Sequence, residues 1–350
     1  MNALEISGLR VRIGERAVVD DVSLTVAPGE CLAIVGESGA GKSMIAHALL
    51  GLTPDEAVVT AEALRIDGIE LREADERAWR DVRGSRIALV SQDALVSLDP
   101  FRRIGLEVAE PLEIHTADSA SERVRRAEAA LDAVAMPDAP RRMRAYSHEL
   151  SGGLRQRALI AAALVTQPRI VVADEPTTAL DATVQLRILT LLREIVDAGT
   201  ALVVISHDLA AVTHIADRVA VVQAGKIVEL GRTADVLERP QHAHTRELVD
   251  AWRIHSNPRP EPQGTVVLAA TGLSKSFAGT GRVVDDVSLT LRRGATLGVV
   301  GESGSGKTTL ARILMGIESP EQGTVTLDGV AWNPLRERER RARRARIQLV

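Results

Sequence analysis

The chain has 350 residues, enough for about two domains, and its 45% hydrophobic and 26% charged residues exclude intrinsic disorder. The net charge of -4 gives no overall attraction to nucleic acid or anionic lipid, and the single cysteine, Cys31, excludes an internal disulfide framework. No apolar run reaches the length of about 18 residues that a membrane-spanning helix needs, and the first residues do not resemble a signal peptide, so we expect a cytoplasmic protein.

The predicted elements alternate along the chain. The first 30 residues and the stretch Leu64–Asp67 alternate apolar and polar side chains, as antiparallel strands do. Segment 102–149 has a helical pattern. Apolar runs that each precede a helix-length segment predict buried parallel strands at Leu32–Val35, Ile170–Ala173 and Leu202–Ile205. The sequence thus predicts an α/β core with an antiparallel subdomain and a helical insert.

A phosphate-binding loop follows the first of these runs. The sequence GESGAGKS, Gly36–Ser43, fits the P-loop pattern and opens a predicted helix at Lys42–Leu50. Its glycines let backbone amides approach a phosphate, and the helix N-terminus favours negative charge. We expect Lys42 to reach the β- and γ-phosphates of ATP and Ser43 to bind Mg²⁺. The predicted ATP contacts are Gly36, Glu37, Ser38, Gly39, Ala40, Gly41, Lys42, Ser43 and Met44.

An acidic pair follows the second run. Asp174 ends the predicted strand and is expected to bind the metal, and Glu175 is then placed to polarise a water in line with the γ-phosphate. Such a pair is weak evidence alone, because it is often a solvated turn. The P-loop upstream favours a catalytic role for this acidic pair.

The chain contains an internal duplication. VDDVSL at Val19–Leu24 reappears at Val284–Leu289, and the P-loop reappears as GESGSGKT at Gly301–Thr308, both at an offset of 265 residues. A period this long indicates a duplicated domain, and we expect a fragment of a longer double-domain protein. The expected organisation is a domain at 1–250, a Pro-rich linker at 251–264 and an incomplete second copy at 265–350.

The second P-loop repeats the predicted chemistry of the first. The chain has only four lysines, and two of them, Lys42 and Lys307, occupy equivalent P-loop positions, so an incidental glycine-rich turn is excluded. Thr308 is the expected Mg²⁺ ligand of this copy. The predicted ATP contacts are Gly301, Glu302, Ser303, Gly304, Ser305, Gly306, Lys307, Thr308 and Thr309.

The stretch LSGGLRQR, Leu150–Arg157, resembles the signature motif of the ABC transporter nucleotide-binding domain, and the resemblance covers residues 1–250 and resumes at 265. It implies a RecA-like P-loop NTPase core with an antiparallel β subdomain and a helical subdomain at about 93–150. It also implies that Ser151, Gly152, Gly153 and Gln156 contact an ATP held by a partner cassette. Gln92 would be the Q-loop residue that contacts ATP and Mg²⁺, and Asp181 would belong to the D-loop. His207 would be a catalytic switch residue, acting with the catalytic residues Lys42 and Glu175.

The two copies differ where the family usually stacks an aromatic ring on adenine. The first copy has Ile13 at this position and the second has Phe277. Stacking is therefore expected to be weaker in the first copy, although an aliphatic side chain can still cover a base.

Several stretches are similar to the dipeptide, oligopeptide and nickel importers of this family, namely 92–100, 146–153, 173–181 and 240–248. This similarity implies an ATP-hydrolysing subunit at the cytoplasmic face of the membrane, attached peripherally. The implied partners are transmembrane permease subunits, a second ABC cassette and, indirectly, a solute-binding protein. Apolar side chains that make a permease-docking surface plausible are Phe101, Ile104, Leu106 and Val108, and we expect at least half of them to pack the helical insert instead.

Two alternatives belong to other classes. One is a soluble double-cassette ABC ATPase that acts on ribosomes, but such proteins carry a long charged helical linker, unlike the short Pro-rich one here. The arginine-rich run 336–346 aligns with the mixed-charge segment 72–86, so we expect a solvated helix and no nucleic-acid partner. The other alternative is a non-hydrolysing assembly module, which the presence of Glu175 and His207 disfavours.

Overall fold

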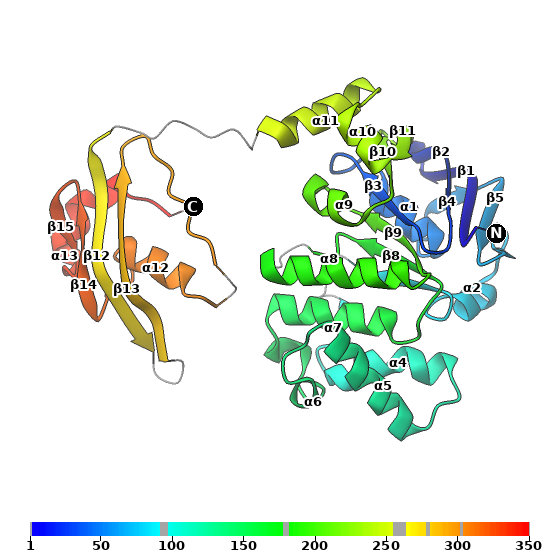
Figure 1. Ribbon diagram of the computed structural model, residues 1–350, viewed down its shortest axis with the longest axis horizontal. Coiled ribbons are helices and arrows are strands. Elements are labelled where there is room, and N and C mark those ends of the chain that lie inside the picture. Colours follow the sequence, from blue (N-terminus) through cyan, green and yellow to red (C-terminus); the bar gives the residue numbers. More distant parts are fainter. Residues whose placement is uncertain are drawn as a thin grey trace. The chain divides into compact units, whose positions relative to one another are not determined.

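The chain forms two compact units, Met1–Ser256 and Asn257–Val350, and each is described by itself (Figure 1). In the described part of the chain, no helix is both long and apolar enough to cross a membrane. The computed structural model describes residues 2–91, 97–177, 182–254, 264–277, 281–301 and 304–349.

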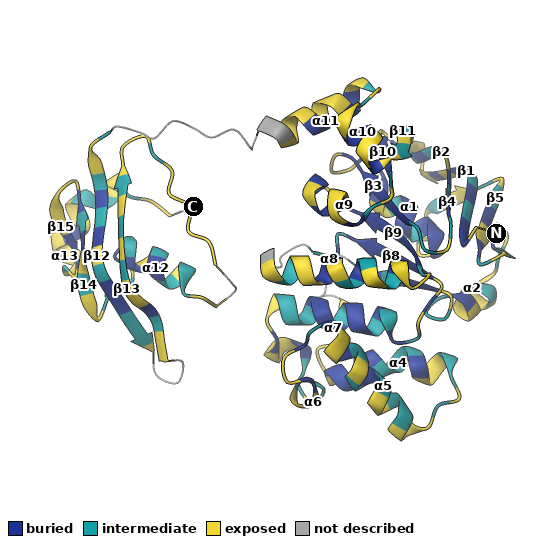
Figure 2. Cartoon of the chain, in the orientation of Figure 1, coloured by how far each residue is buried: buried dark blue, intermediate teal, exposed yellow. Residues whose placement is uncertain are grey.

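A six-stranded sheet forms the centre of the first unit. In spatial order its strands are β11 (Lys226–Arg232), β10 (Arg218–Gln223), β3 (Cys31–Val35), β9 (Ala201–Ile205), β8 (Ile170–Asp174) and β7 (Ile87–Val90). The last five run parallel, and β11 is the antiparallel edge strand. Strands β3, β8 and β9 are buried at every residue, which explains their continuous apolar sequences (Figure 2). The parallel core predicted from the sequence is confirmed.

A second, antiparallel sheet lies in the same unit. Its path is β2–β1–β5–β6, and β4 also pairs with β1. The register of β1 with β2 shifts three times, so the two long strands bend. The bounds are β1 (Leu4–Ile13), β2 (Arg16–Val26), β4 (Ala57–Thr60), β5 (Ala63–Ile66) and β6 (Ile69–Glu70).

Helices connect the strands and build the helical insert. Crossover helices are α1 (Lys42–Leu49), α2 (Glu76–Val82), α8 (Ala182–Asp197) and α9 (Leu209–Ile215). The insert between β7 and β8 contains α4 (Ile104–His115), α5 (Ala120–Ala133), α6 (Ala139–Arg142), a 3₁₀ turn (Ser147–Glu149) and α7 (Gly152–Leu164). Ser119 caps α5 by accepting a hydrogen bond from the amide of Glu122.

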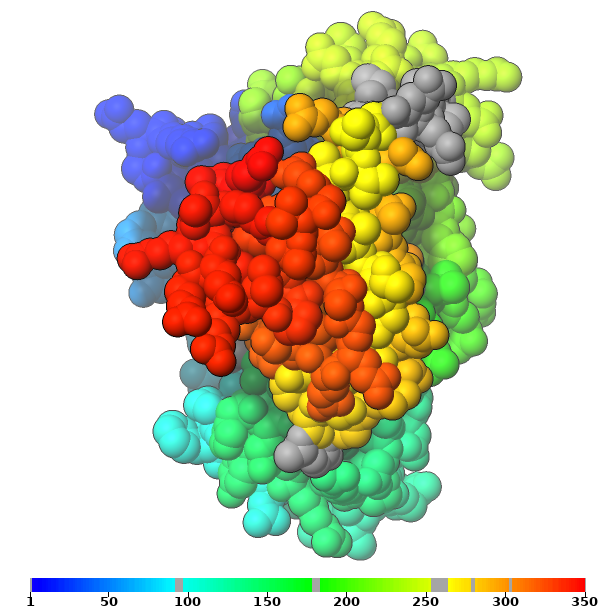
Figure 3. All heavy atoms as spheres, turned by 90° about the vertical axis from the view of Figure 1, so that its left-hand side faces the viewer, coloured from blue at the N-terminus to red at the C-terminus, as the bar shows by residue number. Residues whose placement is uncertain are grey.

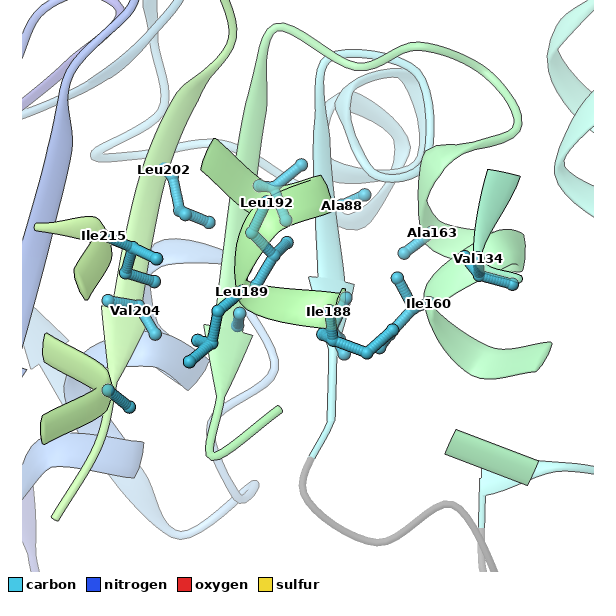
Figure 4. Close-up of a cluster of buried hydrophobic side chains, with 14 of the residues drawn as sticks. Ala88, Val134, Ile160, Ala163, Ile188, Leu189, Leu192, Leu202, Val204 and Ile215 are labelled. Atoms are coloured by element: carbon cyan, nitrogen blue, oxygen red, sulfur yellow. The ribbon is translucent and has the colours of Figure 1, made fainter. Parts of the chain in front are cut away.

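The central sheet separates two apolar cores. Residues of β9 alternate between the two cores. Leu202 and Val204 belong to the core under α8, whereas Ala201, Val203 and Ile205 belong to the core shared with the antiparallel sheet. Figure 4 shows Ile188, Leu189 and Leu192 of α8 in the first of these cores. The strand ends, and with them the loops that carry the site, are therefore fixed by burial on both faces of the sheet.

The first unit ends with two helices, α10 (Thr233–Glu238) and α11 (Ala243–Ile254). Val249 of α11 packs into the core, while Trp252 remains 39% exposed. The helix thus extends into the range 251–264 that the sequence predicted as a linker, because the first proline of that range comes only at Pro258.

The second unit is a four-stranded antiparallel sheet with one longer helix. Its elements are β12 (Val266–Phe277), β13 (Gly281–Arg292), α12 (Lys307–Leu314), β14 (Gln322–Leu327), β15 (Val330–Asn333), α13 (Glu337–Arg340) and a 3₁₀ segment (Arg341–Arg346). The strand order is β13–β12–β14–β15, and in Figure 3 the colours on this face of the unit run from yellow to red. Ile313 of α12 and Trp332 of β15 are fully buried in its core.

The second unit has no strand at the position of β3. Residues 296–300 are the counterpart of β3, yet they are not paired, and Leu297, Val299 and Val300 are 46%, 46% and 93% exposed. In the first unit β3 lies between β10 and β9, and the described residues of the second unit contain no counterpart of either strand. An apolar run therefore remains unpaired where its pairing partners are missing.

Candidate nucleotide site

The P-loop joins the end of β3 to the start of α1. Gly41 is the N-cap of α1 with φ of 103°, and a Cβ there would lie 2.6 Å from the carbonyl oxygen of Val18. Gly36 has a Cβ position only 2.2 Å from the carbonyl oxygen of Val222. Only glycine fits at these two positions, so the backbone of β2 and β10 shapes the loop.

Lys42 begins α1 and folds back over the loop. Its Nζ donates hydrogen bonds to the carbonyl oxygens of Gly36, at 2.8 Å, and Glu37, at 2.7 Å. Burial lowers the pKa of Lys42, and the carboxylates of Glu175 and Asp174 act in the opposite direction. The ammonium group is thus held at the mouth of the loop, within the field of the two carboxylates.

Asp174 ends β8 as a buried carboxyl group, 5% exposed. Burial raises its pKa, while a hydrogen bond from the hydroxyl of Ser43 lowers it. Its Oδ1 atom has no hydrogen-bond partner among the described residues. A buried carboxylate oxygen without a partner, beside a hydroxyl at a P-loop, fits a hard divalent cation such as Mg²⁺.

Glu175 and His207 come from the ends of neighbouring strands and touch each other. The imidazole Nδ1 of His207 lies 3.0 Å from Oε1 of Glu175. The Glu175 side chain is 17% exposed and that of His207 is 66% exposed. Glu175 itself has a positive φ of 47°, and its amide donates to the carbonyl of Ile205, so β9 fixes the strained backbone that aims the carboxylate.

These groups surround one cavity of about 630 Å³. Its lining combines the phosphate-binding loop with the glutamate–histidine pair. The residues that line it are Val18, Ser38, Gly39, Gly41, Lys42, Ser43, Met44, Glu175 and His207.

Comparisons with known proteins identify the family to which this chain belongs. The profile of the ABC transporter family matches residues 19–178 and again residues 284–350. The chain belongs to the ABC transporter family. The resemblance read from the signature motif is thereby confirmed, and the match includes part of each copy of the duplication.

Two relatives show how far the similarity extends. The peptidoglycan transport ATP-binding protein YejF of Agrobacterium fabrum is 40% identical over 344 residues, which are 95% of this chain and 63% of that protein. The oligopeptide transport ATP-binding protein OppD of Salmonella typhimurium is 40% identical over 274 residues, 77% of this chain and 80% of its own length. The chain thus spans less than two thirds of the first relative.

The fold is also that of solved ABC cassettes. The dimeric ATP-binding cassette MJ0796, in a post-hydrolysis state bound to ADP and Pi, superimposes with a TM-score of 0.60 at 27% identity. The match covers 66% of this chain and 98% of that chain. The predicted fold class, a P-loop core with antiparallel and helical subdomains, is confirmed.

The second P-loop of this ABC chain repeats the local geometry of the first. Lys307 donates to the carbonyl oxygen of Gly301 at 2.8 Å, and a Cβ at Gly306 would lie 2.3 Å from the carbonyl oxygen of Val283. Thr308 is exposed at the start of α12. Glu302 and Ser303 lie outside the described residues.

Other predicted site residues lie apart from the cavity. Ile13 ends β1 and is not among its lining residues, and Phe277 ends β12 with Nζ of Lys275 5.3 Å from its ring centroid. The predicted Q-loop and D-loop residues, Gln92 and Asp181, lie outside the described residues.

The signature residues form a separate group at the start of α7. Ser151 is the exposed N-cap and Gly152 has open space around its Cβ position. Gln156 differs from the expectation of an ATP contact: it is 3% exposed, and its amide donates to the carbonyl of Ser91 at 3.4 Å. Position five of a helix that begins at Gly152 faces the core, so Gln156 supports the helix from inside.

One lining residue was not predicted. Val18 of β2 lines the cavity, and its carbonyl oxygen makes the close contact at Gly41. The duplication carried a signal for it, since Val283 stands at the equivalent position immediately before the repeated VDDVSL segment.

Proposed function

We propose that this chain is the ATP-hydrolysing subunit of an importer for peptides or a related small solute. The observation that carries the proposal is the meeting of a P-loop lysine with Glu175 and His207 around one cavity, with the carboxylate of Asp174 close enough to act on the lysine. The printed names of the relatives, peptidoglycan and oligopeptide transport ATP-binding proteins, support the importer branch. They do not favour the alternative, a soluble double-cassette ATPase on ribosomes.

Each side chain has a role that follows from its position. Lys42 and the P-loop amides bind and orient the phosphates at the positive end of α1. Glu175 accepts the proton of the attacking water, and His207 orients the Glu175 carboxylate through their 3.0 Å contact. Because the carboxylate is only 17% exposed, little bulk water competes for it.

The cation is part of the proposal. Ser43 and Asp174 would hold Mg²⁺ in the first copy, and Thr308 would do so in the second. Bound there, Mg²⁺ supplies charge neutralisation for the β- and γ-phosphate oxygens. Gln92, the further predicted ligand, lies outside the described residues.

The site needs groups from a second cassette. Within the first unit, Ser151, Gly152 and Gly153 do not line the cavity that holds Lys42 and Glu175. We propose that this signature completes the P-loop of a partner cassette, and that the first P-loop is completed in turn by a signature from another cassette. ATP turnover should then rise with the square of the protein concentration where two first copies pair.

Permease subunits are the proposed membrane partner, at the cytoplasmic face. A groove of about 460 Å³ between α4, α5 and α6 offers them apolar side chains, including Leu106, which is 56% exposed. Phe101 nearby is 88% exposed, whereas Ile104 and Val108 are fully buried and pack the helical insert. Two of the four residues expected at the docking surface are therefore core residues. A solute-binding protein would act through the permease.

The experiment that tests the function is the Glu175→Gln variant. It should bind ATP as the wild type does and lower kcat by about 10² or more, because a positioned base is lost. Glu194→Gln, an exposed glutamate on α8, is the matched control and should turn over normally. Near-normal turnover in Glu175→Gln would overturn the assignment.

A further inference from the structure

A side chain outside the cavity holds the loop that carries His207. Nε2 of Gln185, in the first turn of α8, donates to Oδ2 of Asp208 at 3.0 Å. Asp208 directly follows His207 and is the N-cap of α9, where its Oδ1 accepts from the amides of Ala210, at 2.9 Å, and Ala211, at 3.3 Å. The two carboxylate oxygens of Asp208 thus join two different helices.

The rest of this short loop is held from the sheet. The amide of Ser206 donates to the carbonyl of Ile34 in β3, and the amide of Asp208 donates to Oγ of Ser206 at 3.0 Å. His207 therefore sits between one residue fixed to β3 and one residue fixed to α9 and α8. Its own ring is 66% exposed, so packing does little to hold it.

We propose that Gln185 is a positioning residue for the proposed ATP hydrolysis, acting through Asp208 on His207. Capping α9 requires only one carboxylate oxygen of Asp208. The charge-assisted bond from Gln185 fixes the other oxygen, and with it the rotation of the Asp208 side chain and the backbone next to His207. Without this bond the imidazole can move away from Oε1 of Glu175, the atom it orients at 3.0 Å.

The same two helices offer a matched control at their other ends. Arg193 of α8 donates to the carbonyl of Ile215, at the end of α9, at 3.0 Å and pairs with Asp217. It joins α8 to the α9 region as Gln185 does, but it lies two turns further along α8, away from His207. Arg193→Gln should lower thermal stability without altering the histidine.

The test uses the full chain and two readouts. Gln185→Met, which keeps length and volume but removes the donor, should lower kcat about tenfold and leave KM for ATP within about twofold. In spectra of chain labelled at the Cε1 of its 8 histidines, the His207 signal, assigned by its loss in His207→Ala, should shift in Gln185→Met and stay in Arg193→Gln. Gln185→Glu, which sets two carboxylates against each other, should show the larger shift.

The outcomes separate this inference from the proposed function on which it rests. An unmoved His207 signal in both Gln185 variants, or an equal loss of kcat in Gln185→Met and Arg193→Gln, would overturn the positioning role. A wild-type chain that neither binds nor hydrolyses ATP would overturn the proposed function instead, and the His207 signal would still report on the Gln185 contact.

Discussion

The two P-loops have nearly the same sequence and the same local geometry, but they have different surroundings. In each, a lysine returns to the first glycine carbonyl of the loop at 2.8 Å, and a glycine N-cap lies against a valine carbonyl. The first loop follows a strand buried between two others and faces Asp174 and Glu175. The second follows an exposed, unpaired segment.

This difference shows which part of the site is formed by a short stretch of sequence and which part is supplied by distant strands. Eight residues and a helix start are enough to form the phosphate-binding loop. The groups that we propose to act on the γ-phosphate come from β8 and from the loop after β9, more than 130 residues beyond the P-loop. A P-loop sequence therefore predicts binding, and hydrolysis depends on the sheet that brings the distant strands beside it.

The copies also share a clamp on the P-loop helix. In the first, Arg83 donates to the carbonyl oxygens of Leu50, at 2.6 Å, and Gly51, at 2.8 Å, and pairs with Glu76, seven residues before it. In the second, Arg344 donates to the carbonyl of Met315 and pairs with Glu337, again seven residues before it. In both copies an arginine thus binds the carbonyls that end the P-loop helix.

The largest change in stability is expected when the arginine of this clamp is replaced. Arg83→Gln leaves two carbonyls at the end of α1 without their charged donor, and it should lower the free energy of unfolding of the first unit by about 2 kcal/mol. Urea denaturation followed by circular dichroism measures the change. Arg80→Gln is the control: its side chain is 76% exposed and, among the described residues, forms an ion pair only with Glu76, so we expect a change below about 0.5 kcal/mol. Equal changes in the two variants would refute the clamp.

A smaller effect is expected at Asp174, whose counterpart is missing from the described residues of the second unit. Because burial raises its folded-state pKa above 3.8, ionisation of Asp174 costs stability, and the full cost is present above the folded-state pKa. Without nucleotide, Asp174→Asn should therefore raise Tm at pH 7. The gain should shrink as the pH falls and vanish below 3.8. Thermal melts across this pH range check it, and a lower Tm at pH 7 would contradict the account.

The smallest effect is expected on ATP affinity, at the position where the first copy has Ile13 and the second has Phe277. Stacking on a base is worth roughly 1–3 kcal/mol, and an aliphatic contact recovers part of it. Ile13→Tyr should therefore tighten ATP binding to the first copy by about fivefold, or 1 kcal/mol. Calorimetry on the full chain, with Lys307→Ala to silence the second P-loop, measures this. Unchanged affinity would mean that the base is held away from residue 13.

Much of the fold and site could be predicted because the signals were local. The P-loop, the acidic end of β8 and the parallel strands were all visible as short patterns, and the duplication supported the P-loop. The unpaired segment at 296–300 could not be foreseen from its own apolar sequence, because a strand forms only where neighbours exist. The inward position of Gln156 and the reach of Gln185 to Asp208 depend on packing between distant helices, which no spacing along the chain reveals.

The central claim is that the catalytic groups act on ATP bound at the first P-loop. The second P-loop, which lacks these groups among the described residues, binds ATP without hydrolysing it. ATP turnover by Lys42→Ala and Lys307→Ala, measured in the full chain at equal protein concentration, tests it most directly. The account predicts turnover reduced by about 10² or more in Lys42→Ala, and turnover within about twofold of wild type in Lys307→Ala. Retained turnover in Lys42→Ala, lost in Lys307→Ala, would contradict it.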